Sequence, residues 1–211
     1  MEITEGTLGK DHPQYTLRLN NLAWLLEKQS KYEDAEILYR RAMEITEDTL
    51  GKNHLEYSTV SSNLAGLLCR QGKYEDAEPL YTRAMEITEE TLGKDHPELS
   101  TGLNNLAGLL HRQGKYEDAE PLYCRAIEIM EETLGKDHPE FSTGLSNLAG
   151  LLHRQGKYED AEPLYRRAME ITEATLGKDH PEYRVKQSGW AAASASESQR
   201  VIVLSVRTLL G

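Results

Sequence analysis

Apolar residues recur every three or four positions between residues 97 and 113. They are Leu103, Leu106, Ala107 and Leu110. On a helix of 3.6 residues per turn this spacing places all four on one side. Gly114, which follows, is a residue that ends helices in a left-handed conformation. The pattern predicts an amphipathic helix, named helix A below.

A second periodic stretch follows Lys115 and continues to about Leu134, where Gly135 ends it. One broad face is apolar and the other is charged. The apolar face consists of Tyr116, Ala119, Leu122, Tyr123, Ala126, Ile127 and Ile129. This is helix B. Only a Gly-Lys pair joins it to helix A, so the two helices should form an antiparallel hairpin. Pro121 should remove one backbone hydrogen bond and bend the first turns slightly.

The same pattern returns along the whole chain. The sequence Thr-Leu-Gly-Lys-Asp-His-Pro at 91–97 recurs nearly unchanged every forty-two residues, at 7–13, 49–55, 133–139 and 175–181. Segments 96–137 and 138–179 differ at six positions, which are Leu99/Phe141, Asn104/Ser146, Cys124/Arg166, Ile127/Met169, Met130/Thr172 and Glu132/Ala174. Such a period predicts an array in which each unit buries its apolar face against its neighbours and offers a repeated surface.

The start of each helix A carries a further signal. Asp95-His96-Pro97-Glu98 predicts a capping box with Asp95 as N-cap and Glu98 at the third helical position. We interpret residues 1–12 as part of a helix B from a preceding repeat and residues 13–179 as four complete helix pairs. Residues 180–211 leave the pattern, and we expect a divergent capping helix followed by a tail whose apolar end is 201–210.

Leu106, Ala107, Tyr116, Ala119, Tyr123 and Ala126 have the spacing that is typical of the tetratricopeptide repeat (TPR). With its longer unit, the sequence resembles the forty-two-residue subtype of kinesin light chains. The resemblance implies an all-α, right-handed superhelical solenoid of antiparallel helix pairs. It also implies a concave groove, lined by A helices, that receives short extended peptides. Asparagines would hold the peptide backbone, and basic residues would meet acidic side chains.

The positions that flank the Leu-Ala core pair of each helix A would line that groove. Most are small or amide side chains, with one asparagine and one basic residue recurring in every unit. The candidate groove residues are Asn20, Asn21, Trp24, Lys28, Asn63, Arg70, Asn104, Asn105, His111, Arg112, Asn147, His153 and Arg154. Leu17 and Glu27 belong to the same row in the first repeat. A side-chain amide both donates and accepts, so it can pair with a peptide group.

Each row has a structural alternative. The asparagines could bridge neighbouring A helices, because buried amides are common where they are satisfied. The arginines could pair with nearby acidic residues such as Glu117 or Glu120. The pattern by itself leaves both interpretations open.

Composition limits the partners. The net charge is -11 and the isoelectric point about 5.2, which argues against a nucleic-acid or anionic-membrane binder. No apolar run approaches the length of a transmembrane helix, and the first residues lack the features of a signal peptide. Cys69 and Cys124 occupy unrelated repeat positions and indicate no disulfide framework. We therefore expect a cytoplasmic protein.

Catalytic chemistry finds no support in the pattern. The repeated histidines His12, His54, His96, His138 and His180 each stand one repeat apart, too far to share a metal, and are expected to pack the turns. His111 and His153 have no nucleophile at a defined spacing. We expect no enzyme activity, no cofactor and no metal.

Two functions of different classes remain. The first is a non-catalytic scaffold that binds a protein or an extended, acidic peptide. The alternative is a structural module that associates end to end, or the sensor array of a larger signalling protein. A sensor array is compatible with the absence of a phosphate-binding Gly-rich loop from this chain.

Overall fold

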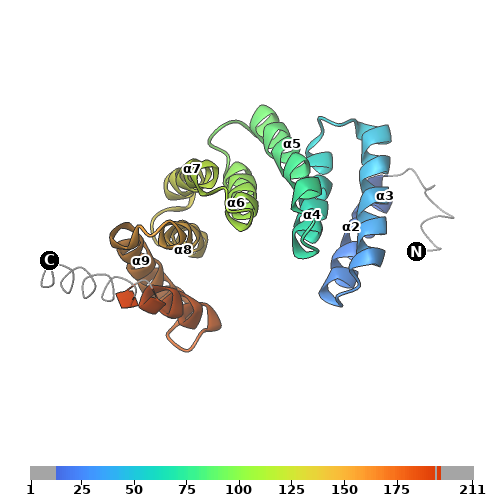
Figure 1. Ribbon diagram of the computed structural model, residues 1–211. Helices are drawn as coiled ribbons and strands as arrows, with labels where there is room; N and C mark the ends of the chain where they lie inside the picture. The colour runs from blue at the N-terminus through green and yellow to red at the C-terminus, as the bar shows by residue number, and fades with distance from the viewer. Residues whose placement is uncertain (1–12, 193, 196–211) are drawn as a thin grey trace, which may run out of the picture. The chain divides into compact units, whose positions relative to one another are not determined.

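All regular structure in the described part of the chain is helical (Figure 1). The computed structural model describes residues 13–192 and 194–195. It divides into two units between Leu109 and Leu110, inside helix α6 (Pro97–Arg112). Unit 1 contains α2 (Pro13–Lys28), α3 (Tyr32–Leu50), α4 (Leu55–Arg70), α5 (Tyr74–Leu92) and most of α6. Unit 2 contains the end of α6, α7 (Tyr116–Leu134), α8 (Pro139–Arg154), α9 (Tyr158–Leu176) and a helical stretch at 181–192.

Even-numbered helices are the predicted A helices, of 16 residues each, and odd-numbered helices are the B helices, of 19 residues each. The expected end of helix B is confirmed, because α7 stops at Leu134 and Gly135 follows at a φ of 87°. Within unit 1, α2 packs on α3 and α4 on α5, and α3 joins the two pairs by packing on α4. In unit 2, α8 packs on both α7 and α9.

Small residues let each A helix approach its B helix. Ala23 on α2 and Ala35 on α3 are fully buried, and Ala149 and Ala161 repeat this arrangement in unit 2. A methyl group keeps the two backbones close, while the fully buried ring of Tyr39 fills the space beside them. The predicted core pattern of alanine and tyrosine is therefore confirmed in these pairs.

The predicted capping box is wrong in its register. The N-cap of α8 is His138, whose Nδ1 accepts a hydrogen bond from the backbone N–H of Glu140. The same bond joins His96 to Glu98 over 3.2 Å. Pro139 at the first helical position has no N–H, so the first donor that needs a partner is that of the next residue. The imidazole reaches it from the position where we had expected only a residue that packs the turn.

Each A helix ends at a left-handed residue. Gly72, Gly114 and Gly156 all have a φ of +78°, and nothing lies within 4 Å of the Cβ that a side chain would add. In repeat one this position is a serine, and Ser30 also adopts a left-handed conformation, with a φ of 61°. A left-handed backbone is strained for any residue that carries a Cβ.

We expect Ser30→Gly to raise the free energy of unfolding by about 0.5–1 kcal/mol, since it removes this strain but gives the unfolded chain more freedom. Urea denaturation followed by circular dichroism measures the change. Gly72→Ser is the matched control and should destabilise by a similar amount, because its site is open and the same strain is introduced. A lower stability for Ser30→Gly would contradict the assignment of strain at this position.

The helical stretch at 181–192 is attached to α8 and α9 through a buried lysine. Lys186 is only 6% exposed, and its Nζ donates to Ser142 Oγ at 2.5 Å and to Thr172 Oγ1 at 2.7 Å. Burial lowers the pKa of Lys186. The expected partial helix B at 1–12 and the apolar end at 201–210 both lie outside the described residues.

Candidate functional site

The first A helix exposes apolar side chains in the predicted row. Leu17 is 57% and Trp24 54% exposed, and the Nζ of Lys28 lies 5.3 Å from the centre of the Trp24 ring. The repeats that follow have threonine and glycine at the positions of Leu17 and Trp24. An ammonium group over an indole ring is an attractive arrangement. This part of the row therefore offers an apolar surface next to a positive charge.

Two asparagines of the row pair with each other across neighbouring A helices. Asn63 Nδ2 on α4 donates to Asn20 Oδ1 on α2 over 2.9 Å. The structural alternative therefore describes these two residues. Asn21, beside them, is exposed. Asn104 and Asn105 on α6 and Asn147 on α8 are half-buried.

The arginine of repeat two has a counter-ion that was not predicted as a site residue. Glu27 on α2 is buried and forms an ion pair with Arg70 on α4. The hydroxyl of Tyr39 also donates to Glu27, over 3.5 Å. Burial is the main cause that raises the pKa of Tyr39, and the charge of Glu27 adds to it. The signal in the sequence was the acidic residue in a row that is otherwise neutral or basic.

Unit 2 has a histidine at the corresponding position. A Cβ on Gly150 of α8 would lie 4.0 Å from His111 Cε1, so the imidazole lies against α8 one turn before Arg154. His111 also meets the ring of Tyr116 edge-on, with centres 5.6 Å apart, and His153 meets Tyr158 in the same way at 5.2 Å. Burial lowers the pKa of His111, and the positive charges of Arg154 and Arg112 lower it further.

Neither Arg112 nor Arg154 forms a salt bridge within the described residues, and both are exposed. The acidic partners that we had considered pair with neither arginine, and Glu117 is exposed. Glu120 accepts hydrogen bonds from Lys157 at 2.8 Å and from Gln155 at 3.0 Å. These two arginines thus present positive charge in a part of the row that contains no acidic side chain.

A tyrosine hydroxyl lies behind the row in each unit. A Cβ on Gly66 would lie 3.3 Å from Tyr81 Oη, and one on Gly150 would lie 3.4 Å from Tyr165 Oη. Glycine on helix A therefore accommodates the hydroxyl of helix B. Burial raises the pKa of Tyr123 to about 12, so this group stays neutral at physiological pH.

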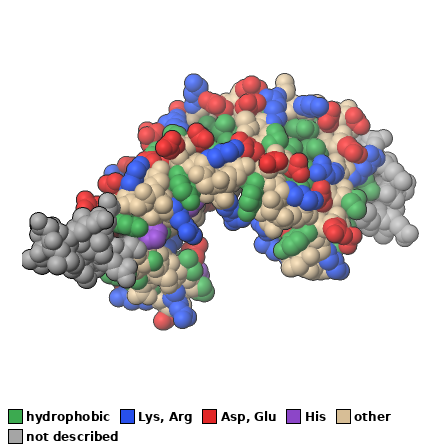
Figure 2. Space-filling view, in the orientation of Figure 1, with side chains coloured by type: hydrophobic (Ala, Val, Ile, Leu, Met, Phe, Trp, Pro, Cys, Tyr) green, Lys and Arg blue, Asp and Glu red, His purple; other side chains and the backbone are tan. Residues whose placement is uncertain are grey.

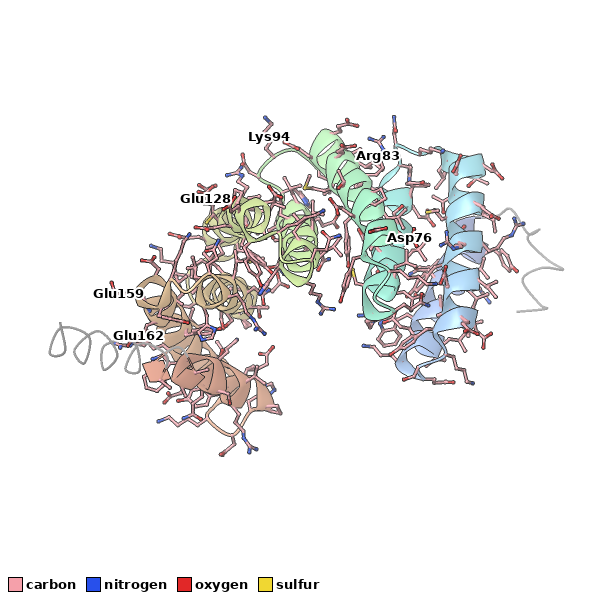
Figure 3. All side chains as sticks on the ribbon, in the orientation of Figure 1. Asp76, Arg83, Lys94, Glu128, Glu159 and Glu162 are labelled. Atoms are coloured by element: carbon pink, nitrogen blue, oxygen red, sulfur yellow. The ribbon has the colours of Figure 1, made fainter. Side chains whose placement is uncertain are left out.

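The B helices carry most of the remaining charge. Asp76, Glu128 and Glu159 are exposed side chains of α5, α7 and α9 (Figure 3). Acidic and basic side chains lie next to one another on the visible face of each unit (Figure 2). Several are paired along one helix, such as Arg83 with Glu86 at 3.0 Å. Interspersed and paired charges of this kind are typical of a solvated face.

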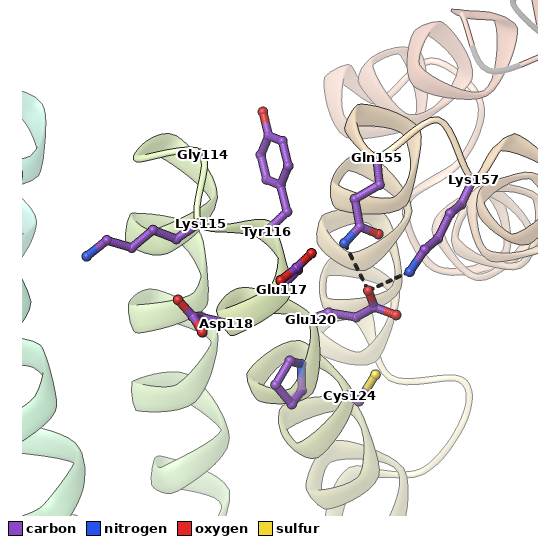
Figure 4. A pocket seen from close by; sticks show the side chains of 10 residues that line it. Gly114, Lys115, Tyr116, Glu117, Asp118, Glu120, Cys124, Gln155 and Lys157 are labelled. Carbon is purple, nitrogen blue, oxygen red and sulfur yellow. Dashed lines mark hydrogen bonds and ion pairs between the residues drawn. The ribbon is translucent and has the colours of Figure 1, made fainter.

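A depression of about 790 Å³ lies between the start of α7 and the loop that leads into α9 (Figure 4). Glu120 lines this depression. The hydrogen bond from Lys157 lowers the pKa of Glu120, the bond from Gln155 adds to this, and together they outweigh the opposite effect of burial. Cys124 lines the same depression, and burial raises the pKa of its thiol. Because the acidic group is already neutralised and the thiol is kept protonated, we do not place a ligand here.

In the part of the chain that the structure describes, no three or more His, Cys, Asp or Glu side chains are grouped to hold a metal ion. The described helices include none with the length and apolar character of a membrane span.

Comparison with known proteins assigns the repeats. A tetratricopeptide repeat model matches residues 56–132, and a second one matches residues 17–56 and 143–182. A search of curated protein sequences found no match.

Two solved structures have the same fold. The first is a Podosopora anserina protein with nearly identical TPR-like repeats, named for kinesin light chain. It is 23% identical, with a TM-score of 0.78 over 93% of each chain. The second is BtubC (BKLC) from P. vanneervenii, which is 22% identical. Its TM-score is 0.72, over 98% of this chain and 86% of that one. The resemblance to kinesin-light-chain-like repeats is thus confirmed at the level of the fold. With the repeat models covering most of residues 17–182 and the helix pairs formed as described, the chain belongs to the tetratricopeptide repeat family, whose arrays are in general protein-interaction scaffolds.

Proposed function

We propose that the chain is a non-catalytic scaffold that binds an extended acidic peptide along the row of A-helix side chains. The observation that carries this proposal is the pair of exposed arginines, Arg112 and Arg154, which have no salt bridge among the described residues. A guanidinium group without a counter-ion is a strong site for a carboxylate, because it can offer two parallel N–H donors.

Amide side chains supply the second part of the site. Asn21 is exposed, and Asn105 and Asn147 are half-buried at the corresponding positions of later repeats. One such amide per repeat matches the alternation of donors and acceptors along a peptide backbone. We assign these three residues to the backbone of the ligand, and Asn20, Asn63 and Asn104 to the inner edge of the same row. Asn20 and Asn63 support that edge through their mutual hydrogen bond.

The remaining site residues set the side-chain preference. Trp24 and Leu17 offer apolar area for one hydrophobic ligand side chain, and Lys28 offers a charge beside it. Arg70 is less available than Arg154, since Glu27 already pairs with it. His111 and His153 give the row in unit 2 polar side chains without negative charge, which suits a carboxylate bound to the neighbouring arginines.

We further propose that residues 13–179 act as the binding array, flanked by a partial repeat at 1–12 and a cap and tail at 180–211. The buried anchor of Lys186 supports a capping role for the helix that contains it. Neither Cys69 nor Cys124 forms a disulfide within the described residues, which is compatible with a reducing compartment, and we propose the cytoplasm as the location.

A second candidate, end-to-end self-association, is favoured by one observation. Leu25 is 47% exposed, whereas Leu67 and Leu151 at the same repeat position are fully buried. An open repeat face of this kind could receive another copy of the chain. Sedimentation velocity over a range of concentrations separates the two candidates, because a binding module alone should remain monomeric on dilution.

The proposed function is tested by selection from a library of random twelve-residue peptides displayed on phage, with the full chain as bait. We expect enrichment of peptides that carry two or more Asp or Glu residues, and loss of the enriched peptides at high salt. Selection at low and at high ionic strength provides the control. Enrichment of basic sequences, or of none, would contradict an acidic ligand.

A further inference from the structure

One position of helix A changes its chemistry from repeat to repeat while its surroundings stay the same. It is occupied by Glu27, Cys69, His111 and His153. The next residue is always basic, and a buried tyrosine of helix B, such as Tyr39 or Tyr123, recurs in every unit. The position therefore alters the charge of the row within a constant framework.

In the first repeat, which belongs to unit 1, this position holds a counter-ion. Glu27 is 6% exposed and accepts both the guanidinium of Arg70, from the following repeat, and the hydroxyl of Tyr39. Arg70 lies back along its own helix, with Nη2 3.6 Å from the Cβ that Gly66 would carry. A carboxylate that is buried and held by two donors keeps its partner closely bound.

In unit 2 the same place in the framework holds His111. Its ring lies against Gly150, which corresponds to Gly66, and Arg154 follows one turn later, as Arg70 does in unit 1. Burial lowers the pKa of His111 and the charges of Arg154 and Arg112 lower it further, and an imidazole supplies no negative charge in either protonation state. The described residues give Arg154 no salt-bridge partner.

We infer that the residue at this position decides whether the arginine of the following repeat can bind an anionic ligand, and that His111 leaves Arg154 available where Glu27 occupies Arg70. The inference rests on the proposed function for the identity of the ligand, a peptide carboxylate. It adds that His111 directs the acidic side chains of the ligand to Arg154 in unit 2, although His111 does not need to contact the ligand. His111 is thus a specificity-determining residue.

The arrangement makes exchange of the two residues a direct test. Tyr123 stands in unit 2 where Tyr39 stands in unit 1, and both are buried. A carboxylate introduced by His111→Glu therefore meets the same kind of hydroxyl donor and the same kind of arginine as Glu27 does. In the reverse direction, Glu27→His removes the counter-ion of Arg70 and leaves a side chain that other repeats already accommodate.

The experiment uses the full chain and nuclear magnetic resonance of the arginine side chains, which reports the mobility of each guanidinium without any ligand. In the wild type we expect slow rotation for Arg70 and fast rotation for Arg154. His111→Glu should slow Arg154, and Glu27→His should release Arg70. An acetylated and amidated pentaglutamate peptide then serves as the probe. It should shift the Arg154 resonance in the wild type and bind about tenfold or more weakly to His111→Glu.

His111→Gln is the matched control, because it keeps a neutral polar side chain and adds no carboxylate. It should leave the guanidinium of Arg154 as mobile as it is in the wild type, and it should weaken peptide binding much less than His111→Glu does. A guanidinium of Arg154 that stays mobile in His111→Glu would overturn the inference, and so would an equal loss of binding in His111→Gln and His111→Glu. Absence of any peptide response in the wild type would count against the proposed function instead. In that case the mobility of Arg70 and Arg154 would still show whether each guanidinium is held by the residue of the preceding repeat.

Discussion

Leu67→Ala is expected to lower the free energy of unfolding by about 3 kcal/mol, whereas Leu25→Ala at the same repeat position should cost less than about 1 kcal/mol. Leu67 is fully buried, since α3 packs against α4, and its removal leaves a cavity. Leu25 is 47% exposed and loses little contact on truncation. Urea denaturation followed by circular dichroism compares the two variants.

The pair is well controlled because both changes replace leucine with alanine at equivalent positions of an A helix, so the change in helix propensity is the same. Leu151→Ala tests the same expectation in unit 2, where the equivalent leucine is also fully buried. Equal losses at Leu25 and Leu67 would mean that Leu25 is covered in solution. End-to-end association would then be the first explanation to examine, by repeating the measurement at several protein concentrations.

The double variant Arg112→Glu, Arg154→Glu is expected to weaken binding of an acidic peptide by about a hundredfold or more. Each substitution replaces an attraction with a repulsion, and neither arginine has a described salt-bridge partner whose loss would disturb the fold. Wild-type affinity should fall as salt rises, because exposed charges are screened over about 8 Å at physiological ionic strength. Fluorescence anisotropy with a selected acidic peptide measures both effects.

Arg166→Glu, Arg40→Glu is the matched control on the B helices. Both residues lie on B helices, both pair with an acidic residue four positions earlier, and both are exposed. The net charge of the two double variants is the same, so a general electrostatic effect would weaken binding equally in both. Normal binding by the Arg112, Arg154 variant, with unchanged circular dichroism, would place the function outside the A-helix row.

The sequence predicted the helices closely because their signals are local. Apolar spacing defines the faces of α6 and α7, and the glycines at 114 and 135 end these helices where the left-handed conformation requires them. The N-caps were predicted one residue early, at Asp95 instead of His96. An aspartate is the more common cap, and only the backbone geometry shows that the imidazole nitrogen reaches the free N–H.

The sequence predicted which residues form the A-helix row, but it did not predict their hydrogen-bond and ion-pair partners. Periodicity placed Asn63 and Arg70 on one face of a helix, but their partners, Asn20 and Glu27, come from a helix more than forty residues earlier. The sequence offered Glu120 as an equally plausible partner for an arginine, and the structure pairs it with Lys157 instead. Distance along the chain carries no information on such contacts.

By itself, the sequence determined the repeat, the helix pairs and the family, because these follow from short-range spacing repeated four times, which leaves few alternatives. Only the tertiary structure decided which equivalent residues differ in role. Leu25 and Leu67 are the same residue in the same local sequence pattern, yet one is exposed and the other buried. Arg70 and Arg154 are likewise equivalent, yet only Arg70 meets a carboxylate. Burial and charge pairing depend on the residues of the neighbouring helix, so they cannot be inferred from the sequence of one repeat alone.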